Sequence, residues 1–414
     1  MNKKKVLIVG SCAKEYALAK YLSKNSEIEK VYIAPGNIAS SDFAERIDIR
    51  ENDAQGLLEF AIKEEINLTI VPSQEAIRAD IAGLFQANSQ LIFAPCAEAA
   101  KFAISRANSK KFLYKLHIPT PKFGIFEKSS LAYDYVNNAK MPLLITADVD
   151  NENSVRSVCA NVNLAKTCID DLFLREEPKV VIEDYAYGHP FTIYVMTDGY
   201  CALPFAAVGD YKFIEDGGAG LFTRGMGAYV PDYKVSLDVV ADIMQNVINP
   251  VIKNLEKRNN PYMGILGAEC VLTGENNYTV TGFTPFLKEH DTQAVLNSLD
   301  TDLYRLFEAC AVGSFADDYT EIAVNDLSTL SCVLYSRKGG ALITGLEMVD
   351  DSTEITHFST SKNNYFEYLT NQGRTLVITQ TASTISRARE LLYDNVEDIY
   401  FEGKKYRRDI CAEV

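Results

Sequence analysis

The chain has 414 residues, which at roughly 100–200 residues per domain predicts two to four domains. Its hydrophobic content of 47% and charged content of 23% are ordinary for a globular protein. A net charge of −15 repels phosphate backbones, which argues against nucleic acid as a partner. A small anionic ligand still fits this composition if one local pocket is basic.

Apolar segments and cysteines together predict a cytoplasmic protein. No apolar stretch approaches the ~18 residues that cross a membrane, and residues 1–6 do not begin a signal peptide. The number of cysteines is odd and no pair has CxxC spacing, which is typical of free, mostly buried thiols in a reducing compartment. These cysteines are Cys12, Cys96, Cys159, Cys168, Cys201, Cys270, Cys310, Cys332 and Cys411.

Short apolar strands alternate with helical segments over residues 1–100. This alternation indicates βαβ units and a parallel sheet that helices cover on both faces. We therefore expect a Rossmann-like domain that binds ligands at the carboxyl ends of its strands. The predicted strands are 6–9, 31–34, 68–71 and 91–94, and the predicted helices are 16–23, 57–64 and 77–86.

The following residues mix helices and strands around one segment that is rich in glycine. Residues 201–231 predict a long irregular loop, and such a loop inside a compact domain is usually functional or disordered. Asn276 and Asn277 predict a hairpin turn. The predicted helices are 97–116, 235–257, 303–311 and 384–393, and the predicted strands are 143–145, 180–182, 192–195, 264–272, 278–281, 330–335 and 376–379.

Residues 10–15 (Gly-Ser-Cys-Ala-Lys-Glu) connect the first predicted strand to the first predicted helix. Glycine lets a backbone approach a ligand, and a helix N-terminus favours anions. The segment is not GxGxxG, because Cys12 and Ala13 occupy the expected glycine positions. A dinucleotide site is therefore not expected, and a simple strand-to-helix turn is the alternative.

Two polar clusters are further candidates for a site. Asp210 and Lys212, together with the glycine-rich residues 220–229, combine N–H donors with positive charge that suits phosphate or carboxylate. A mobile surface loop is the alternative for this segment. Residues 289–291 (Glu-His-Asp) form either a solvated turn or a site. The histidines His117, His189, His290 and His357 lie far apart in sequence and show no metal-binding spacing.

Segments across nearly the whole chain, taken in order, resemble the glycinamide ribonucleotide synthetase (phosphoribosylamine–glycine ligase) family. The most specific segment is residues 225–229, Gly-Met-Gly-Ala-Tyr. Residues 6–18 look like the family's opening strand and its Gly-Gly-Arg-Glu-His-Ala-Leu motif. Further similar segments are 34–37, 68–71, 93–95, 198–199, 203–204, 291–293, 370–374 and 408–410.

The resemblance implies an α/β fold in three parts. It implies a Rossmann-like N-terminal domain at 1–100, an ATP-grasp domain at 101–322 and a small α+β C-terminal domain at 323–414, with a mobile subdomain near 122–192. The family uses Mg-ATP to activate glycine as an acyl phosphate, which the amine of phosphoribosylamine attacks. This chemistry needs positive charge at the phosphates, oxygen ligands for magnesium and a loop that excludes water.

The sequence departs from the family at the nucleotide site. The family's Ile-Lys-Ala-Asp-Gly and Gly-Lys-Gly-Val are here Ile-Thr-Ala-Asp-Val at 145–149 and Asn-Ser-Val-Arg at 153–156. Both lysines are lost, and Arg156 is a possible replacement for one charge. The resemblance implies a degraded nucleotide site at Arg106, which replaces a family lysine, and at Glu183, Tyr185 and Ala186, which match the family's adenine hinge.

The metal motif is also changed. The family's Glu-Phe-Asn-X-Arg aligns with Gly-Phe-Thr-Pro-Phe at 282–286, so Gly282 and Thr284 stand at the metal-ligand positions. Glycine offers no ligand side chain and a lone threonine hydroxyl is a poor one. We therefore expect no metal site, which puts the binding of Mg-ATP in doubt. Glu269 would compensate if it faced the site, but strand alternation leaves its direction open.

The motifs of the family's substrate site match this sequence better than the nucleotide and metal motifs do. Asp210 and Lys212 match the family's Asp-His-Lys-Arg, although its arginine is here Phe213. The resemblance implies substrate binding by Asp210, Lys212, Thr223, Gly225, Met226, Gly227 and Gly264.

Two hypotheses about function follow. The first is a catalytically silent or repurposed family member that binds a small molecule like glycine or phosphoribosylamine, or pairs with a complete paralogue. The second is an active, divergent ligase that joins phosphoribosylamine and glycine while ATP is converted to ADP. The lost lysines and metal ligands favour the first, because removing one charge-stabilising group often costs ~10²–10³ in rate. No catalytic residue is assigned from the sequence.

Overall fold

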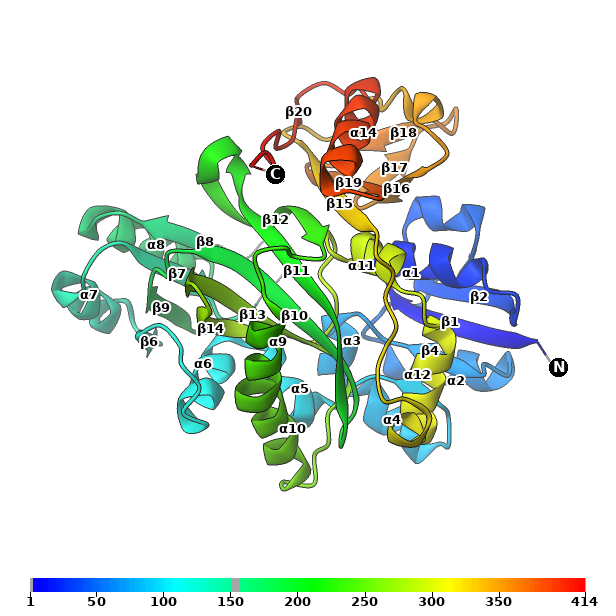
Figure 1. The fold of residues 1–414 in the computed structure, drawn as a ribbon, viewed down its shortest axis with the longest axis horizontal. Coiled ribbons are helices and arrows are strands. Elements are labelled where there is room, and N and C mark those ends of the chain that lie inside the picture. Colours follow the sequence, from blue (N-terminus) through cyan, green and yellow to red (C-terminus); the bar gives the residue numbers. More distant parts are fainter. Residues whose placement is uncertain (1–2, 150–155, 414) are drawn as a thin grey trace.

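The computed structural model describes residues 3–149 and 156–413 (Figure 1). Residues 153–155, where the sequence departs from the family's Gly-Lys-Gly-Val motif, lie outside the described residues. No helix in the described part of the chain is long and apolar enough to cross a membrane. The described cysteines are free, and six of the nine are buried, which confirms the prediction made from their spacing.

A parallel five-stranded sheet in the order β3-β2-β1-β4-β5 forms the N-terminal domain, drawn in blue in Figure 1. Leu7 and Val9 pack into one hydrophobic core, whereas Val6 and Ile8 pack into another. Helices therefore cover both faces, and the predicted Rossmann-like arrangement is confirmed. The elements are β1 Lys4–Gly10, α1 Ala13–Ser23, β2 Ile28–Pro35, β3 Glu45–Arg46, α2 Ala54–Lys63, β4 Leu68–Ile70, α3 Gln74–Arg78, α4 Ile81–Ala87 and β5 Ile92–Phe93.

Two predicted helices are each broken in the structure. The helix expected at 77–86 is α3 followed by α4, because Asp80 has a φ of 53° between them. The helix expected at 97–116 is α5 (Ala97–Ile104) followed by α6 (Arg106–Lys115). Ser105 is extended there, and its hydroxyl accepts from the Asn108 N–H and donates to Asp148 over 2.7 Å. The break makes Arg106 the first residue of α6.

An antiparallel sheet in the order β6-β9-β7-β8 forms a separate layer with two helices, at the left of Figure 1. Its side chains share one small core with those of the helices, and this core includes Leu143, Ile145 and Ile182. The elements are β6 Phe123–Phe126, α7 Ser129–Asn138, β7 Leu143–Ala147, β8 Arg156–Cys159, α8 Val162–Leu174 and β9 Val180–Asp184.

A long sheet in the order β14-β13-β10-β11-β12-β15-β19-β16 runs through the middle of the molecule, with β20 beside β15. It crosses the predicted boundary near residue 322, because β12 pairs with β15 from Gly227↔Cys332 to Val230↔Thr329. The boundary itself stays a prediction. The strands are β10 His189–Asp198, β11 Ala202–Glu215, β12 Ala219–Val230, β13 Met263–Gly274, β14 Asn277–Thr284, β15 Ser328–Ser336, β16 Thr353–His357, β19 Gly373–Ala382 and β20 Lys404–Lys405.

The prediction of a long irregular loop at 201–231 is wrong. The segment forms β11 and β12, a long hairpin (green in Figure 1) that turns at residues 216–218. Gly217 and Gly218 have φ values of 67° and 72°, which a tight turn requires and other residues rarely adopt. The tip is held by the chain's C-terminal segment, since the Gly217 N–H donates to Asp409 over 2.8 Å.

Helices and a two-stranded ribbon complete the fold. The predicted hairpin turn at Asn276 and Asn277 is confirmed between β13 and β14. The C-terminal strands pack against α14 around a core of their own, in agreement with the predicted α+β arrangement. The remaining elements are α9 Leu237–Ile243, α10 Asn249–Glu256, α11 Thr292–Ser298, α12 Leu303–Val312, α13 Phe315–Asp318, β17 Thr360–Lys362, β18 Tyr368–Thr370 and α14 Ile385–Asp398.

We predict that Phe307→Ala destabilises the contact between the N-terminal sheet and α12. The Phe307 ring is stacked on Phe93 of β5 with a centroid distance of 4.3 Å, and both rings are buried. Losing the ring should lower the free energy of unfolding by about 3–5 kcal/mol. Urea denaturation followed by circular dichroism measures the change. Leu237→Ala is the control, since that side chain is 85% exposed; equal effects of the two substitutions would refute the prediction.

Candidate functional site

A cleft of about 810 Å³ lies between the four-stranded sheet and the long sheet. One part of its wall is apolar, whereas its floor carries charged side chains from four elements of the chain. The apolar part includes Pro142, Leu144, Val158, Phe191 and Val271. The charged floor consists of Arg106, Arg156, Asp210, Lys212, Glu269 and Lys288.

Glu269 of β13 points into this cleft, which settles the direction that strand alternation left open. It stands opposite Gly282 in the pairing of β13 with β14. One of its oxygens accepts from Arg106 Nη1 over 2.8 Å, and the other lies 3.3 Å from Lys288 Nζ. Burial alone would raise the pKa of Glu269, but Arg106 and Lys288 outweigh it and hold the pKa well below the usual range. Arg156 acts in the same direction.

The family's metal-ligand positions do not fit a magnesium ion in this chain. A Cβ atom placed on Gly282 would lie 2.8 Å from Arg106 Nη1, so the guanidinium occupies the space that a ligand side chain would need. Thr284 donates its hydroxyl hydrogen to the Phe286 carbonyl over 3.0 Å. Magnesium prefers several oxygen ligands in near-octahedral geometry. Glu269 lies nearby, but two cations already contact it.

Lys288 is the residue that the sequence reasoning missed. Its ammonium donates to Thr192 Oγ1 over 2.7 Å and lies 3.0 Å from Asp210 Oδ2. Together with its contact to Glu269, it therefore links β10, β11 and β13. Its position directly before the polar residues 289–291 was the available signal, but pattern reasoning cannot tell which strands a lysine after β14 will reach.

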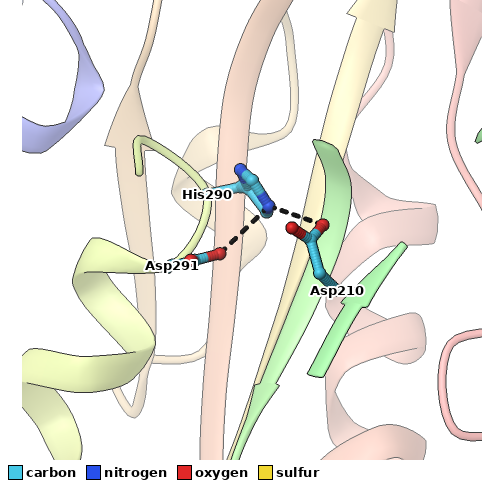
Figure 2. A group of neighbouring side chains, drawn as sticks. All are labelled: Asp210, His290 and Asp291. Carbon is cyan, nitrogen blue, oxygen red and sulfur yellow. Dashed lines mark hydrogen bonds and ion pairs between the residues drawn. The ribbon is translucent and has the colours of Figure 1, made fainter. Parts of the chain in front are cut away.

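Asp210 of the floor forms a buried group with His290 and Asp291 (Figure 2). His290 Nε2 lies 3.0 Å from a carboxylate oxygen of each aspartate. The alternative of a solvated turn at 289–291 is wrong, because all three of its residues are buried. Burial opposes protonation of His290, but the two carboxylates outweigh it and raise its pKa.

These three residues are the one group of histidine, cysteine and acidic side chains in the described ranges whose ligand atoms converge within 4.8 Å. A metal ion does not fit there, because Asp210 also pairs with the ammonium groups of Lys212 and Lys288. Burial would raise the pKa of Asp210, but Lys212, Lys288 and His290 together hold it well below the usual range. The group is therefore a charge network that already contains its cations.

The predicted hinge residues Glu183, Tyr185 and Ala186 all line the cleft. Glu183 forms a buried ion pair with Lys110 of α6, whose ammonium also donates to Thr120 Oγ1 over 3.0 Å. This pair ties β9 to α6, the helix that also carries Arg106 of the charged floor. Thr146, at the position of a family lysine, is buried and lines the same cleft.

The structure separates the predicted substrate residues into two sets. Asp210 and Lys212 line the cleft, and Thr223 supports them by donating to the Lys212 carbonyl over 2.7 Å. Gly225 lies against His290, where an added Cβ would come within 2.0 Å of the imidazole ring. The other set consists of Met226, which is buried in a core with Val333 and Phe358, Gly227, which packs on Ile410, and Gly264, which lies beside Pro95.

Comparison with known proteins covers nearly the whole chain. Three domain models of phosphoribosylglycinamide synthetase match: the N domain at residues 4–103, the ATP-grasp (A) domain at 104–287 and the C domain at 335–413. The phosphoribosylamine–glycine ligase of Neisseria meningitidis serogroup B is 31% identical over 98% of both chains. The chain belongs to the phosphoribosylamine–glycine ligase family.

Solved structures agree with this family assignment at the level of the fold. The phosphoribosylamine–glycine ligase of Thermotoga maritima superposes with a TM-score of 0.79 at 21% identity, covering 98% of this chain and 100% of that one. The biotin carboxylase domain of the Hydrogenobacter thermophilus 2-oxoglutarate carboxylase superposes with a TM-score of 0.71 at 13% identity, covering 98% and 92%. Family membership confirms the ATP-grasp fold that the motifs predicted.

We predict that the pKa values of two histidines of this ligase-family chain shift in opposite directions from the ordinary value. The pKa of His290 should lie above the ordinary value of about 6.5. Burial lowers the pKa of His357 to about 3, so that ring should stay neutral in mildly acidic buffer. Heteronuclear NMR of histidine-labelled protein across pH measures both, with His290→Asn and His357→Asn used for assignment.

The sign of the effect on stability follows from the raised pKa of His290. Its contribution to folding is present in full below the unfolded pKa of about 6.5 and is lost as pH rises through the higher folded value. An imidazole signal of His290 that titrates at or below the ordinary value would contradict the proposed pairing with two carboxylates.

We predict that Lys110→Ala lowers the free energy of unfolding by about 3–5 kcal/mol, because it leaves the Glu183 carboxylate buried without its cation. The double variant Lys110→Met/Glu183→Met should recover most of the loss, since it removes both charges. Thermal and urea denaturation measure the series. Lys111→Ala, which alters the exposed neighbouring lysine, is the control. A Lys110→Ala variant as stable as this control would rule out an important buried pair.

Proposed function

We propose that this family member binds a small anionic ligand in its ATP-grasp cleft and does not carry out Mg-ATP-dependent ligation. The observation that carries the proposal is the Arg106 guanidinium, which pairs with Glu269 and lies 2.8 Å from the point where a Cβ atom on Gly282 would stand. The ligase reaction of the family depends on a divalent ion at the transferred phosphate. Neither Gly282 nor Thr284 supplies a ligand for that ion.

The positive charge for phosphoryl transfer is also reduced. Thr146 has no charge at the position of a family lysine, and Arg156 lies on β8, one position later than the second lysine of the motif. Charge stabilisation of the transferred group is the main contribution of proteins to this type of reaction. Charge stabilisation is reduced both at the metal-ligand positions and at Thr146. Turnover should therefore be far below that of a complete ligase.

The substrate half of the cleft supports binding of a molecule like glycine or phosphoribosylamine. Lys212 and Asp210 face the cleft, and Thr223 holds the Lys212 backbone through its hydroxyl. Such a protein could act alone in the cytoplasm or together with a complete paralogue of the same family. Association with a paralogue would give a silent member a regulatory role in purine biosynthesis.

An active, divergent ligase is the second candidate. The identity of 31% over 98% of both chains with a named ligase favours it. Glu269 also faces the cleft, and Arg156 adds a positive charge to the lining of this cleft. In this alternative, the present contacts of Glu269 with Arg106 and Lys288 would have to open before Glu269 could hold a metal ion.

A coupled assay separates the two candidates. The pure protein is incubated with Mg-ATP, glycine and phosphoribosylamine, and ADP release is followed beside the Neisseria meningitidis relative as a positive control. We expect no release above background, because the losses at the metal and phosphate positions each cost about 10²–10³ in rate. ADP release that depends on both substrates and rises with protein concentration would overturn the proposed function in favour of the ligase.

A further inference from the structure

We infer that fixed cations take the place of the divalent ion in this cleft, so that it binds a phosphate-bearing ligand in its metal-free form. The inference rests on the proposed function and specifies the ligand of the same cleft. Two residues carry it, Lys288 and Arg106, and they contact different oxygens of the Glu269 carboxylate.

Lys288 occupies the position between two carboxylates from different strands. Its Nζ lies 3.0 Å from Asp210 of β11 and 3.3 Å from Glu269 of β13, and it donates to Thr192 of β10 over 2.7 Å. Three oxygen atoms around one cation resemble a partial metal shell, but the cation here is covalently part of the chain. A divalent ion at this point would have to displace an ammonium that is 10% exposed and bound on three sides.

Arg106 is the second cation that contacts Glu269. Its Nη1 lies 2.8 Å from Glu269, and it stands where a side chain on Gly282 would begin. A guanidinium cannot lose its charge in a protein and presents its donors in a planar fork that matches phosphate oxygens. The chain has therefore lost a metal ligand at 282 and placed a permanent positive charge in the same volume.

The charges on the floor do not cancel. The cleft is lined by six cationic side chains and five carboxylates, and one of these carboxylates, Glu183, already pairs with the buried Lys110. The cations are Arg106, Arg156, Lys212, Lys234, Lys288 and Arg407, and the carboxylates are Glu183, Asp184, Asp210, Glu269 and Glu413. This excess of positive charge arises without any added ion, although the chain as a whole has a net charge of −15. A cleft with fixed positive charge favours the most negatively charged form of a ligand. For a nucleoside polyphosphate, that form is the one without magnesium.

The apolar wall decides which class of anion fits. Pro142, Leu144, Val158 and Val271 line the cleft together with the hinge residues 183–186. These side chains suit a flat, weakly polar ring at one end of the ligand, and the charged floor suits phosphate groups at the other. Free inorganic phosphate would use only the floor. A phosphate-bearing ligand with an attached ring uses the whole 810 Å³ of the cleft.

Isothermal titration of the full chain with ATP, in buffer with EDTA and in buffer with excess Mg²⁺, tests the inference. We expect ATP to bind in EDTA and to bind several-fold more weakly with Mg²⁺, because magnesium removes two negative charges from the ligand. Lys288→Gln should weaken binding in EDTA by about tenfold or more. Lys338→Gln, which removes an exposed lysine paired with Glu402, should leave it unchanged.

Two further variants separate a lost charge from a lost fold. Lys288→Arg keeps the charge and should retain most of the affinity in EDTA. The triple variant Gly282→Glu/Thr284→Asn/Lys288→Met supplies metal ligands and removes the ammonium, so ATP binding should become stronger on adding Mg²⁺. The Arg106 guanidinium lies at the far end of a flexible side chain, so it can move aside for the new carboxylate. Circular dichroism confirms that each variant is folded before titration.

The inference is overturned if Mg²⁺ strengthens ATP binding by the unaltered chain, if ATP does not bind in EDTA at millimolar concentration, or if Lys288→Gln binds as the unaltered chain does. Failure of the proposed function has a different signature, which is ADP release that requires glycine and phosphoribosylamine. A chain that neither turns over nor binds free ATP would keep the proposed loss of ligation and refute the metal-free ligand.

Discussion

The ion pairs of Lys288 with Asp210 and Glu269 are the constraint on which the rest of the cleft depends. They connect neighbouring parts of the long sheet at the point where β11 and β13 face the ligand cavity. A buried carboxylate without a cation costs several kcal/mol, so neither acid could stay charged at this place alone. Lys288 keeps both acids ionised together with Arg106, which pairs with Glu269, and Lys212, which pairs with Asp210.

The same network explains why the acidic residues do not form a metal site. In Figure 2, Asp210 and Asp291 approach His290 from two sides, as the ligands of a metal do. The decisive contacts are those of Asp210 with Lys212 and Lys288, which already satisfy its charge. Converging ligand atoms are therefore weak evidence for a metal when ammonium groups lie within contact of the same carboxylate.

Sequence reasoning was successful where a local pattern decides the structure. Strand periodicity located β1, β2 and β4, and the order of family motifs identified the ATP-grasp fold. It failed at 201–231, where frequent glycines suggested a loop although cross-strand pairing, from Gly209↔Tyr229 to Glu215↔Ala219, makes a hairpin. Frequent glycines indicate only that the backbone can adopt many conformations. A hairpin forms when residues pair with partners in the neighbouring strand, and glycine content does not predict that pairing.

The candidate site was predictable to the same extent. The hinge and the pair Asp210 and Lys212 followed from motif order, because each motif is a contiguous run in the chain. The direction of Glu269 and the reach of Lys288 depend on the register of β13 with β14 and on how the chain continues after β14. A one-residue change of register reverses every side chain, so no single-sequence pattern could fix these two contacts.

A covalently attached cation differs from magnesium in a way that bears on catalysis. Magnesium arrives with the nucleotide and can follow the phosphate charge as it moves, whereas Lys288 is held by Asp210, Glu269 and Thr192 before any ligand enters. An interaction that is equally strong in the ground state and the transition state improves binding without raising the rate. Under the proposed function, exchanging a mobile metal for a fixed ammonium would preserve a reason to bind phosphate while removing a reason to transfer it. Such an exchange would account for a cleft that has cations on its floor but lacks the family's ligand side chains at 282 and 284.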